Sequence, residues 1–298
     1  MERDYQAGLT ARSATLALRR SLAAAGIDTP DVDSRLLIAA VLGGSSLDLI
    51  REPDRILTAD ETTALMTFER RRIDREPVSR ILGQRGFYGR SFRLTPATLD
   101  PRPCSETLIE AALGLAREEG WSQRPLRILD VGTGSGCLLI TLLAELPEAT
   151  GVGTDISVAA LATASYNAER NGVARRAEFL ERRYLDGIDG SFDLLISNPP
   201  YIESSEIARL DPEVRVFDPL AALDGGADGL DAYRELAAGL SRVVPEGWGL
   251  FEVGAGQAPA VAGLLRHHAS NAATIVSRTW NDLGGHERCV AIKTQSYP

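Results

Sequence analysis

A short stretch around two prolines combines residue types that could hold a planar amide for reaction. SNPPYI, at 197–202, follows an apolar run typical of a buried strand. Asn198 can accept a hydrogen bond from an NH₂ group, and the rigid Pro199-Pro200 pair can aim the Pro199 carbonyl at the second N–H. Tyr201 can stack on a planar target. Because amide and exocyclic-amine nitrogens are poor nucleophiles, such a clamp would act by positioning them.

A glycine-rich loop supplies a second set of residues with possible chemistry. In LDVGTGSGC, Asp130 is followed by glycines at every second position, which let the backbone turn tightly and a ligand lie against it. Asp155 ends the next expected strand, where its carboxylate can accept hydrogen bonds from both hydroxyls of a ribose. The spacing D-x-G-x-G-x-G differs from the dinucleotide pattern G-x-G-x-x-G and indicates a nucleoside cofactor without pyrophosphate.

Alternating strands and helices must position both motifs. From Ser105 onward we expect strands at 127–131, 151–156, 192–197 and 248–253, with helices at 137–146 and 157–171. Such alternation predicts an α/β fold with a doubly wound, mainly parallel sheet.

The first eighty or so residues instead show helical patterns. Leu16, Leu18, Leu22 and Ala25 recur at roughly helical spacing, Thr29-Pro30 is expected to open a second helix, and Thr58 and Glu61 match a capping box. FYGRSFRLTPATL, at 87–99, predicts a β-hairpin. The expected domains are therefore a helical substrate-recognition domain at 1–84, a hairpin linker at 85–104 and an α/β domain at 105–298.

Composition excludes several classes of protein. A net charge of −9 disfavours a broad nucleic-acid-binding surface. The three cysteines are widely spaced, so we expect free thiols and neither a disulfide framework nor a metal site. No apolar run approaches a membrane span, and the first residues lack the apolar core of a secretory signal. We expect a cytoplasmic monomer.

The order of these motifs along nearly the whole chain resembles that of release-factor N5-glutamine methyltransferases of the HemK type. These are class I methyltransferases that use S-adenosylmethionine. The similar segments are REPVSRILGQRGFYGRSFRL, PATLDPRPCSETLIE, LDVGTGSG, SNPPYI, DPLAALDGGADGLDAYR, LFEVGAGQA and NDLGGHER. The resemblance implies methyl transfer to the glutamine side-chain amide in the Gly-Gly-Gln motif of peptide-chain release factors, with the helical domain and hairpin gripping the substrate.

The resemblance also assigns roles to individual residues. The catalytic and substrate-binding residues that it implies are Asn198, Pro199, Pro200, Tyr201, Arg102 and Glu106, with Pro101 in the same segment. The cofactor contacts that it implies are Asp130, Gly132, Thr133, Gly134, Gly136, Asp155, Ile156 and Asn198. Among these, Asp130 would orient the loop or meet the methionine amine.

Three departures from the family pattern leave the methyl acceptor and the adenine contacts open. Asp100 precedes Pro101, Cys104-Ser105 replaces an acidic residue and threonine, and Arg182 or Arg183 stands where a carboxylate is expected, beside Glu181. A paralogue that methylates another protein, or a small amine or amide, is therefore an alternative. The role of His286, which follows two glycines, is also open.

Two alternatives come from other classes of protein. A DNA or RNA base amino-methyltransferase would share both motifs, but it usually needs a basic groove, which this acidic chain does not show. A catalytically inactive binding protein would be expected to lose Asn198 or the loop glycines, and these are intact.

Overall fold

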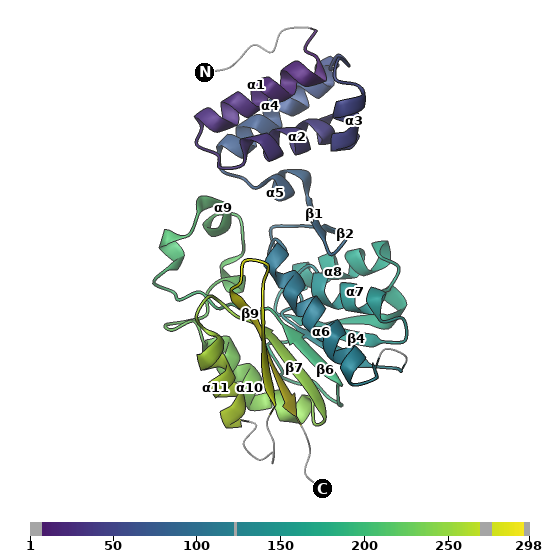
Figure 1. Ribbon diagram of the computed structural model, residues 1–298, viewed down its shortest axis with the longest axis vertical. Helices are drawn as coiled ribbons and strands as arrows, with labels where there is room; N and C mark the ends of the chain where they lie inside the picture. The colour runs from purple at the N-terminus through teal and green to yellow at the C-terminus, as the bar shows by residue number, and fades with distance from the viewer. Residues whose placement is uncertain (1–7, 122–123, 269–275, 295–298) are drawn as a thin grey trace. The chain divides into compact units, whose positions relative to one another are not determined.

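The computed structural model describes residues 8–121, 124–268 and 276–294, which form two compact units. The first unit comprises the described residues up to Gly83 together with Asp211–Phe217, and the second comprises Gln84–Leu210 and the described residues from Asp218 onward. The units are coloured by residue number in Figure 1. The roles and boundaries of the domains expected from the sequence stay a prediction.

The first unit is helical. Its helices are α1 (Ala11–Ala24), α2 (Pro30–Val41), α3 (Ser46–Arg51), α4 (Ala59–Ile73), α5 (Val78–Leu82) and the short α9 (Pro212–Arg215). The expected capping box of α4 is confirmed, because Thr58 and Glu61 exchange hydrogen bonds with each other's backbone N–H groups. Thr29 is the N-cap of α2, but its hydroxyl donates to Asp33 and caps no backbone group.

Apolar side chains of α1, α2 and α4 form the core of this unit, including Leu18, Leu22, Leu37 and Leu65. Leu16 was expected on the same face of α1, but it is 44% exposed. Residues two apart in a helix point in nearly opposite directions. Leu16 therefore points away from the buried face, whereas Leu18 and Leu22, which are four apart, point inward.

A buried cation joins α9 to the other helices of the first unit. Nε of Arg72 lies 2.7 Å from Asp33, and its Nη1 lies 3.1 Å from Glu213 in α9. Nε of Arg75 lies 2.9 Å from the same glutamate. Because Arg72 is only 6% exposed, these pairs compensate a charge that would be costly to bury alone.

The second unit contains a seven-stranded sheet with the order β5-β4-β3-β6-β7-β9-β8. Its strands are β3 (Arg127–Val131), β4 (Thr150–Asp155), β5 (Ala177–Glu181), β6 (Leu194–Ser197), β7 (Gly247–Glu252), β8 (Ser277–Asn281) and β9 (Glu287–Thr294). The pairs among the first five strands in this order are parallel, and β9 is antiparallel to both β7 and β8. The predicted mainly parallel, doubly wound sheet is confirmed.

Helices cover both faces of this sheet (Figure 1). The helices are α6 (Glu106–Glu118), α7 (Cys137–Glu145), α8 (Val158–Arg170), α10 (Asp231–Val243) and α11 (Ala258–His268). Along β3, Ile128 belongs to the core with α6 and α7, whereas Leu129 and Val131 belong to the core with α10 and α11. Alternate side chains of each central strand therefore enter opposite cores.

The expected hairpin is present, although its strands are β1 (Gln84–Phe87) and β2 (Arg90–Arg93) and it ends earlier than predicted. The rings of Phe87 and Phe92 meet edge to face, with centroids 6.2 Å apart. The hairpin belongs to the second unit.

Candidate active site

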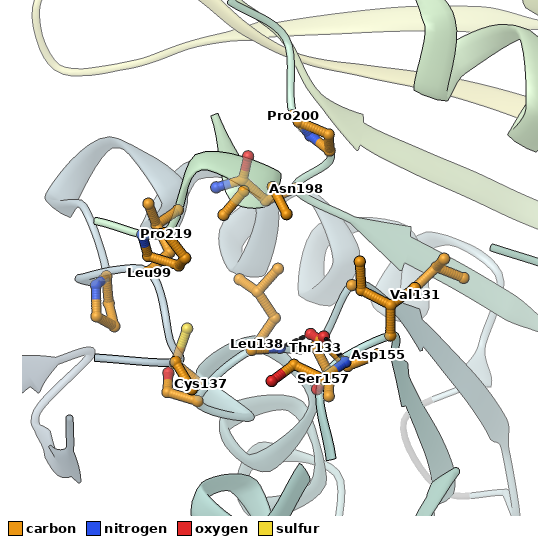
Figure 2. A pocket seen from close by; sticks show the side chains of 18 of the residues that line it. Leu99, Val131, Thr133, Cys137, Leu138, Asp155, Ser157, Asn198, Pro200 and Pro219 are labelled. Carbon is orange, nitrogen blue, oxygen red and sulfur yellow. Dashed lines mark hydrogen bonds between the residues drawn. The ribbon is translucent and has the colours of Figure 1, made fainter. Parts of the chain in front are cut away.

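A pocket of about 340 Å³ opens at the carboxyl ends of β3, β4 and β6. It lies where the strand order reverses, because β4 and β5 continue the sheet on one side of β3 and β6 and β7 on the other. Open α/β sheets bind ligands at such switch points. Figure 2 shows Asn198 and Pro200 on one side of this pocket and Thr133 and Asp155 on the other.

The glycine loop after β3 forms one wall of the pocket through Gly132, Thr133 and Gly134. Gly132, Gly134 and Gly136 all have positive φ angles, which side chains with a Cβ rarely adopt. A Cβ at Gly132 would meet no protein atom within 4 Å, whereas one at Gly136 would come within 2.7 Å of Ile140. The loop thus leaves room for a ligand at its start and packs closely on α7 at its end.

Asp130 stabilises the glycine loop through hydrogen bonds to its side chain. It has no exposed surface, and its Oδ2 accepts hydrogen bonds from Oγ1 of Thr133 at 2.7 Å and from the Leu139 backbone N–H at 3.3 Å. Within the described part of the chain, its Oδ1 has no hydrogen-bond partner. Burial is the main reason that the pKa of Asp130 is raised to about 7. Asp130 does not line the pocket itself.

Asp155 is the last residue of the neighbouring strand, β4, and lines the pocket. Its Oδ2 accepts a hydrogen bond from the Gly134 backbone N–H, and its Oδ1 accepts one from the Ser157 N–H, each at 2.9 Å. Each carboxylate oxygen can accept a further hydrogen bond, so the residue can also bind two neighbouring hydroxyl groups.

The wall next to Asp155 suits a flat, apolar group. Ile156 is 55% exposed although it is aliphatic, and it lines the pocket together with Tyr184. Arg182 and Arg183 line the same region, and the Arg183 guanidinium lies 5.0 Å from the centroid of the Tyr184 ring. Glu181 is exposed and is not among the lining residues. Two cations therefore line this part of the pocket, where a carboxylate was expected at one of the two positions.

The SNPPYI segment forms the opposite wall through Asn198 and Pro200. Asn198 is half-buried, and its Nδ2 donates to Oγ of Ser105 at 3.3 Å. Pro199 is buried, and neither it nor Tyr201 is among the lining residues. The Tyr201 hydroxyl instead lies 3.4 Å from Oε1 of Glu252, and burial raises the pKa of this tyrosine.

The DGGADG loop, residues 224–229, contacts the end of this segment. The Gly225 backbone N–H donates to the carbonyl of Ile202 at 2.8 Å, and the Gln257 side chain donates to the carbonyl of Tyr201 at 2.9 Å. A Cβ at Gly225 would come within 2.8 Å of the Tyr201 Cα. These glycines therefore allow two backbone segments to approach closely, a role that their spacing alone did not indicate.

Glu252, at the end of β7, is a buried residue near the site that sequence analysis did not single out. It has no exposed surface, and burial raises its pKa to about 7 although the hydrogen bond from Tyr201 and the charges of Arg288 and Arg102 lower it. Its position at the carboxyl end of a parallel strand, next to β6 in the sheet, could have drawn attention to it.

Only some residues of the segment before α6 line the pocket. Pro101 and Ser105 line it, but Arg102 pairs with Asp218 at 2.5 Å. Glu106 accepts a hydrogen bond from the Tyr88 backbone N–H in the hairpin at 2.8 Å, so its substrate contact stays a prediction.

The other residues that the sequence analysis singled out also lie outside the pocket lining. Asp100 is 3% exposed and lies 3.7 Å from Nε of Arg85. Cys104 is half-buried, and burial raises the pKa of its thiol. His286 is exposed in the turn between β8 and β9, where its backbone N–H donates to Asp282.

The residues present fit a nucleoside cofactor on one side of the pocket. The cavity volume lies in the range of small-molecule sites, roughly 300–1,000 Å³. The glycine loop leaves space, Asp155 offers acceptors, and Ile156 offers an apolar surface. In the described ranges, no cluster of three or more potential metal ligands occurs. The helices described are too short or too polar to cross a membrane.

Comparison with known proteins gives consistent matches. Residues 14–83 match the PrmC N-terminal domain, and residues 118–210 match the methyltransferase small domain. A release factor glutamine methyltransferase of Bradyrhizobium diazoefficiens is 46% identical over 97% of both chains. Another, of Rhodospirillum rubrum, is 48% identical over 92% of this chain and 82% of its own.

Solved structures agree on the fold. The hMettl16 catalytic domain in complex with MAT2A 3'UTR hairpin 6 matches 71% of this chain and 77% of its own, with a TM-score of 0.55 and 15% identity. At this identity the match shows a methyltransferase fold and nothing further.

Proposed function

Because the chain belongs to the release factor glutamine methyltransferases, we propose that it transfers a methyl group from S-adenosylmethionine to N5 of the glutamine in the Gly-Gly-Gln motif of a peptide-chain release factor. The observation that carries this proposal is one pocket with two different walls. The glycine loop and Asp155 form one wall, and Asn198 forms the other. A methyl donor and a planar amide can therefore meet there.

The cofactor wall holds the donor in this proposal. The backbone of Gly132 and Gly134 leaves space for the methionine part, with Thr133 and Gly136 completing the loop. Asp155 binds the ribose hydroxyls and Ile156 packs against the adenine. Asp130 acts indirectly, because its carboxyl group holds Thr133 and the start of α7. S-adenosylmethionine, when bound, supplies an electrophilic methyl group.

The acceptor wall holds the glutamine. The side-chain oxygen of Asn198 accepts one N–H of the amide and the Pro199 carbonyl accepts the other, so the nitrogen lone pair faces the methyl group. S-adenosylmethionine would supply the methyl group for a new C–N bond as its S–C bond breaks and the thioether S-adenosylhomocysteine leaves, and the displaced amide proton would pass to water. Pro200 lines the pocket, and Tyr201 anchors the segment through Glu252.

The substrate-recognition domain expected at 1–84 and the hairpin contact the body of the release factor in this proposal. Residues 14–83 match a domain that is found in the same family, which supports a shared role in substrate recognition. Arg102 and Glu106 contribute near the pocket entrance by shaping the segment around Pro101, through their bonds to Asp218 and Tyr88.

Methyl transfer can be tested with the full chain, labelled S-adenosylmethionine and an unmodified class I release factor. We expect label on the glutamine of the Gly-Gly-Gln motif and none on a release factor in which this glutamine is replaced by alanine. A cell lysate offered in parallel distinguishes the alternatives. Label on another protein, a small molecule or nucleic acid, with none on the release factor, would overturn the proposed substrate.

A further inference from the structure

One asparagine of α8 binds two segments that lie far apart in the sequence. Asn167 is 1% exposed, and its Nδ2 donates to the carbonyl of Ser135 at 2.8 Å and to that of Arg93 at 3.1 Å. Its Oδ1 accepts a hydrogen bond from the Arg93 backbone N–H at 2.8 Å. Ser135 belongs to the glycine loop, and Arg93 is the last residue of β2 in the hairpin. One side-chain amide thus binds the cofactor loop and the hairpin together.

The chemistry of the Asn167 amide fixes this arrangement. A carboxamide has two N–H donors and one carbonyl oxygen. Only the oxygen can accept from the Arg93 N–H, so the NH₂ group faces the carbonyls of Arg93 and Ser135. A movement of the glycine loop that carried the Ser135 carbonyl away would leave buried polar groups unpaired, which is unfavourable. The positions of the loop and of the end of β2 therefore depend on each other.

Further contacts attach α8 to both segments, and Figure 1 shows β2 beside this helix. A Cβ at Gly136 would come within 3.2 Å of the Ala164 Cβ, so α8 packs closely on the glycine loop. Oγ1 of Thr163 lies 3.1 Å from Oγ1 of Thr95, two residues after the end of β2. The helix therefore contacts both segments on either side of Asn167.

The chain that follows β2 leads directly into the pocket wall. The Thr98 N–H and hydroxyl both donate to the Thr95 carbonyl at 3.1 Å, which closes a tight turn. Ala97 and Leu99 of this segment line the pocket, as Ser135 does in the glycine loop. Asn167 itself is not among the lining residues. It can therefore act on the pocket only through the two segments that it binds.

We propose that Asn167 is a positioning residue that couples the glycine loop to the hairpin, so that a bound cofactor strengthens binding of the release factor at the hairpin. This inference rests on the proposed function, in which the loop holds S-adenosylmethionine and the hairpin contacts the release factor. A cofactor that orders the loop fixes the Ser135 carbonyl, and Asn167 then holds the end of β2 against α8. The release factor meets a hairpin that is already ordered, so less of its binding free energy is lost to ordering.

The first test needs no release factor. Hydrogen exchange of the full-length protein can be followed by mass spectrometry with and without S-adenosylhomocysteine, which has no methyl group to transfer. We expect slower exchange in the glycine loop and in hairpin residues 84–93, which are not among the pocket-lining residues. In Asn167→Ala we expect the ligand to protect the loop but no longer the hairpin. Equal protection of the hairpin in this variant, or none in the wild type, would overturn the proposal.

Two further variants separate coupling from a general loss of packing. Asn171→Ala is the matched control, because Nδ2 of Asn171 lies 3.4 Å from the Ser91 carbonyl in β2. This variant removes a contact between α8 and β2, and we expect it to retain hairpin protection. An equal loss in Asn171→Ala would overturn the specific role of Asn167. If Asn167→Ala does not fold, Asn167→Ser replaces it, since one hydroxyl proton cannot serve both carbonyls.

The second test measures the coupling as an affinity. A release factor whose Gly-Gly-Gln glutamine is replaced by alanine presents no amide to the cofactor, so direct contact between the two ligands is reduced. We expect the wild type to bind it ~5-fold or more tightly with S-adenosylhomocysteine than without, and the release factor to raise the affinity for S-adenosylhomocysteine by the same factor. Calorimetry measures both affinities.

Asn167→Ala should remove most of this difference in affinity, whereas Asn171→Ala should keep it. An unchanged factor in Asn167→Ala would overturn the proposal, because the two sites would then be coupled by another route. If the wild type binds no release factor, the proposed function fails, and hydrogen exchange still decides whether the glycine loop and the hairpin are coupled.

Discussion

The glycine loop and the SNPPYI segment each lie beside a buried acid at the end of a parallel strand, but the two acids are held differently. Asp130 binds groups that follow it closely in sequence, in Thr133 and Leu139. Glu252 meets the hydroxyl of a distant segment, that of Tyr201. One carboxyl group stabilises a single local loop, whereas the other connects separate parts of the chain.

Because of this difference, substitutions in the two walls of the pocket should have different effects. A change near Asp130 should act on the cofactor loop and therefore on cofactor affinity. A change near Glu252 should act on Tyr201 and the SNPPYI segment, and therefore on methyl transfer after the cofactor has bound. Variants of residues in the two walls can test whether cofactor affinity and methyl transfer are affected separately.

The largest effect is expected from Asn198→Ala. Methyl transfer should fall by ~10²-fold or more, the scale of one preorganised polar contact at a reacting group, while cofactor affinity stays nearly unchanged. Single-turnover kinetics and calorimetry measure the two quantities. Asn171→Ala, at the end of α8, is the control. Loss of cofactor binding in Asn198→Ala would show that this residue supports the cofactor wall.

Asp155→Ala should show the opposite pattern. Removing a charged acceptor of two cofactor hydroxyls should weaken cofactor binding by ~1.5–3 kcal/mol. Calorimetry with the full chain measures this, with Glu178→Ala on the exposed part of β5 as the control. An unchanged affinity would remove Asp155 from the cofactor site.

Ionisation of the two buried acids should lower the free energy of unfolding as the pH rises. Their pKa values are raised from 3.8 and 4.5 to about 7 for Asp130 and Glu252, so the folded state binds more protons than the unfolded state between these limits. The stabilising contribution is present below about pH 4 and is lost as the pH rises through about 7.

Asp130→Asn and Glu252→Gln should each remove part of this pH dependence, on the order of 1 kcal/mol between pH 5 and 8. Denaturant unfolding at several pH values measures it. If both variants retain the wild-type slope, these acids are ionised in the folded protein throughout the range.

The smallest effect is expected at the edge of the cofactor wall. Arg183→Asp restores an acceptor where the family pattern has one, so cofactor affinity should be unchanged or tighter by about 1 kcal/mol at most. Arg175→Asp, which makes the same charge change outside the pocket lining, is the control. Abolished binding in a folded Arg183→Asp protein would give this arginine a direct role toward the cofactor.

Local motifs made the geometry of the glycine-loop wall predictable from the sequence. The glycine loop, the strand before it and the helix after it are contiguous, so spacing alone indicates their geometry. The same holds for the capping box at Thr58 and Glu61. The parallel core of the sheet followed from apolar strands that alternate with helices.

Contacts between distant segments were not predictable in this way. Glu252 lies within a strand whose residues are all buried, and nothing in its neighbours indicates that Tyr201 approaches it. Strands β8 and β9 were missed because their polar residues, such as Arg278 and Lys293, interrupt the apolar pattern. The bond of Glu106 to the hairpin likewise depends on tertiary packing.

The grouping of Asp211–Phe217 with the amino-terminal helices bears on how this protein can be divided. Glu213 shares Arg72 and Arg75 with that unit, yet Leu210 and Asp218 on either side belong to the other. The two units are therefore interleaved in sequence and are not successive modules. A shortened protein beginning at residue 84 would keep Glu213 and lose both of its cations, so exchanging the amino-terminal part between relatives requires exchanging residues 211–217 with it.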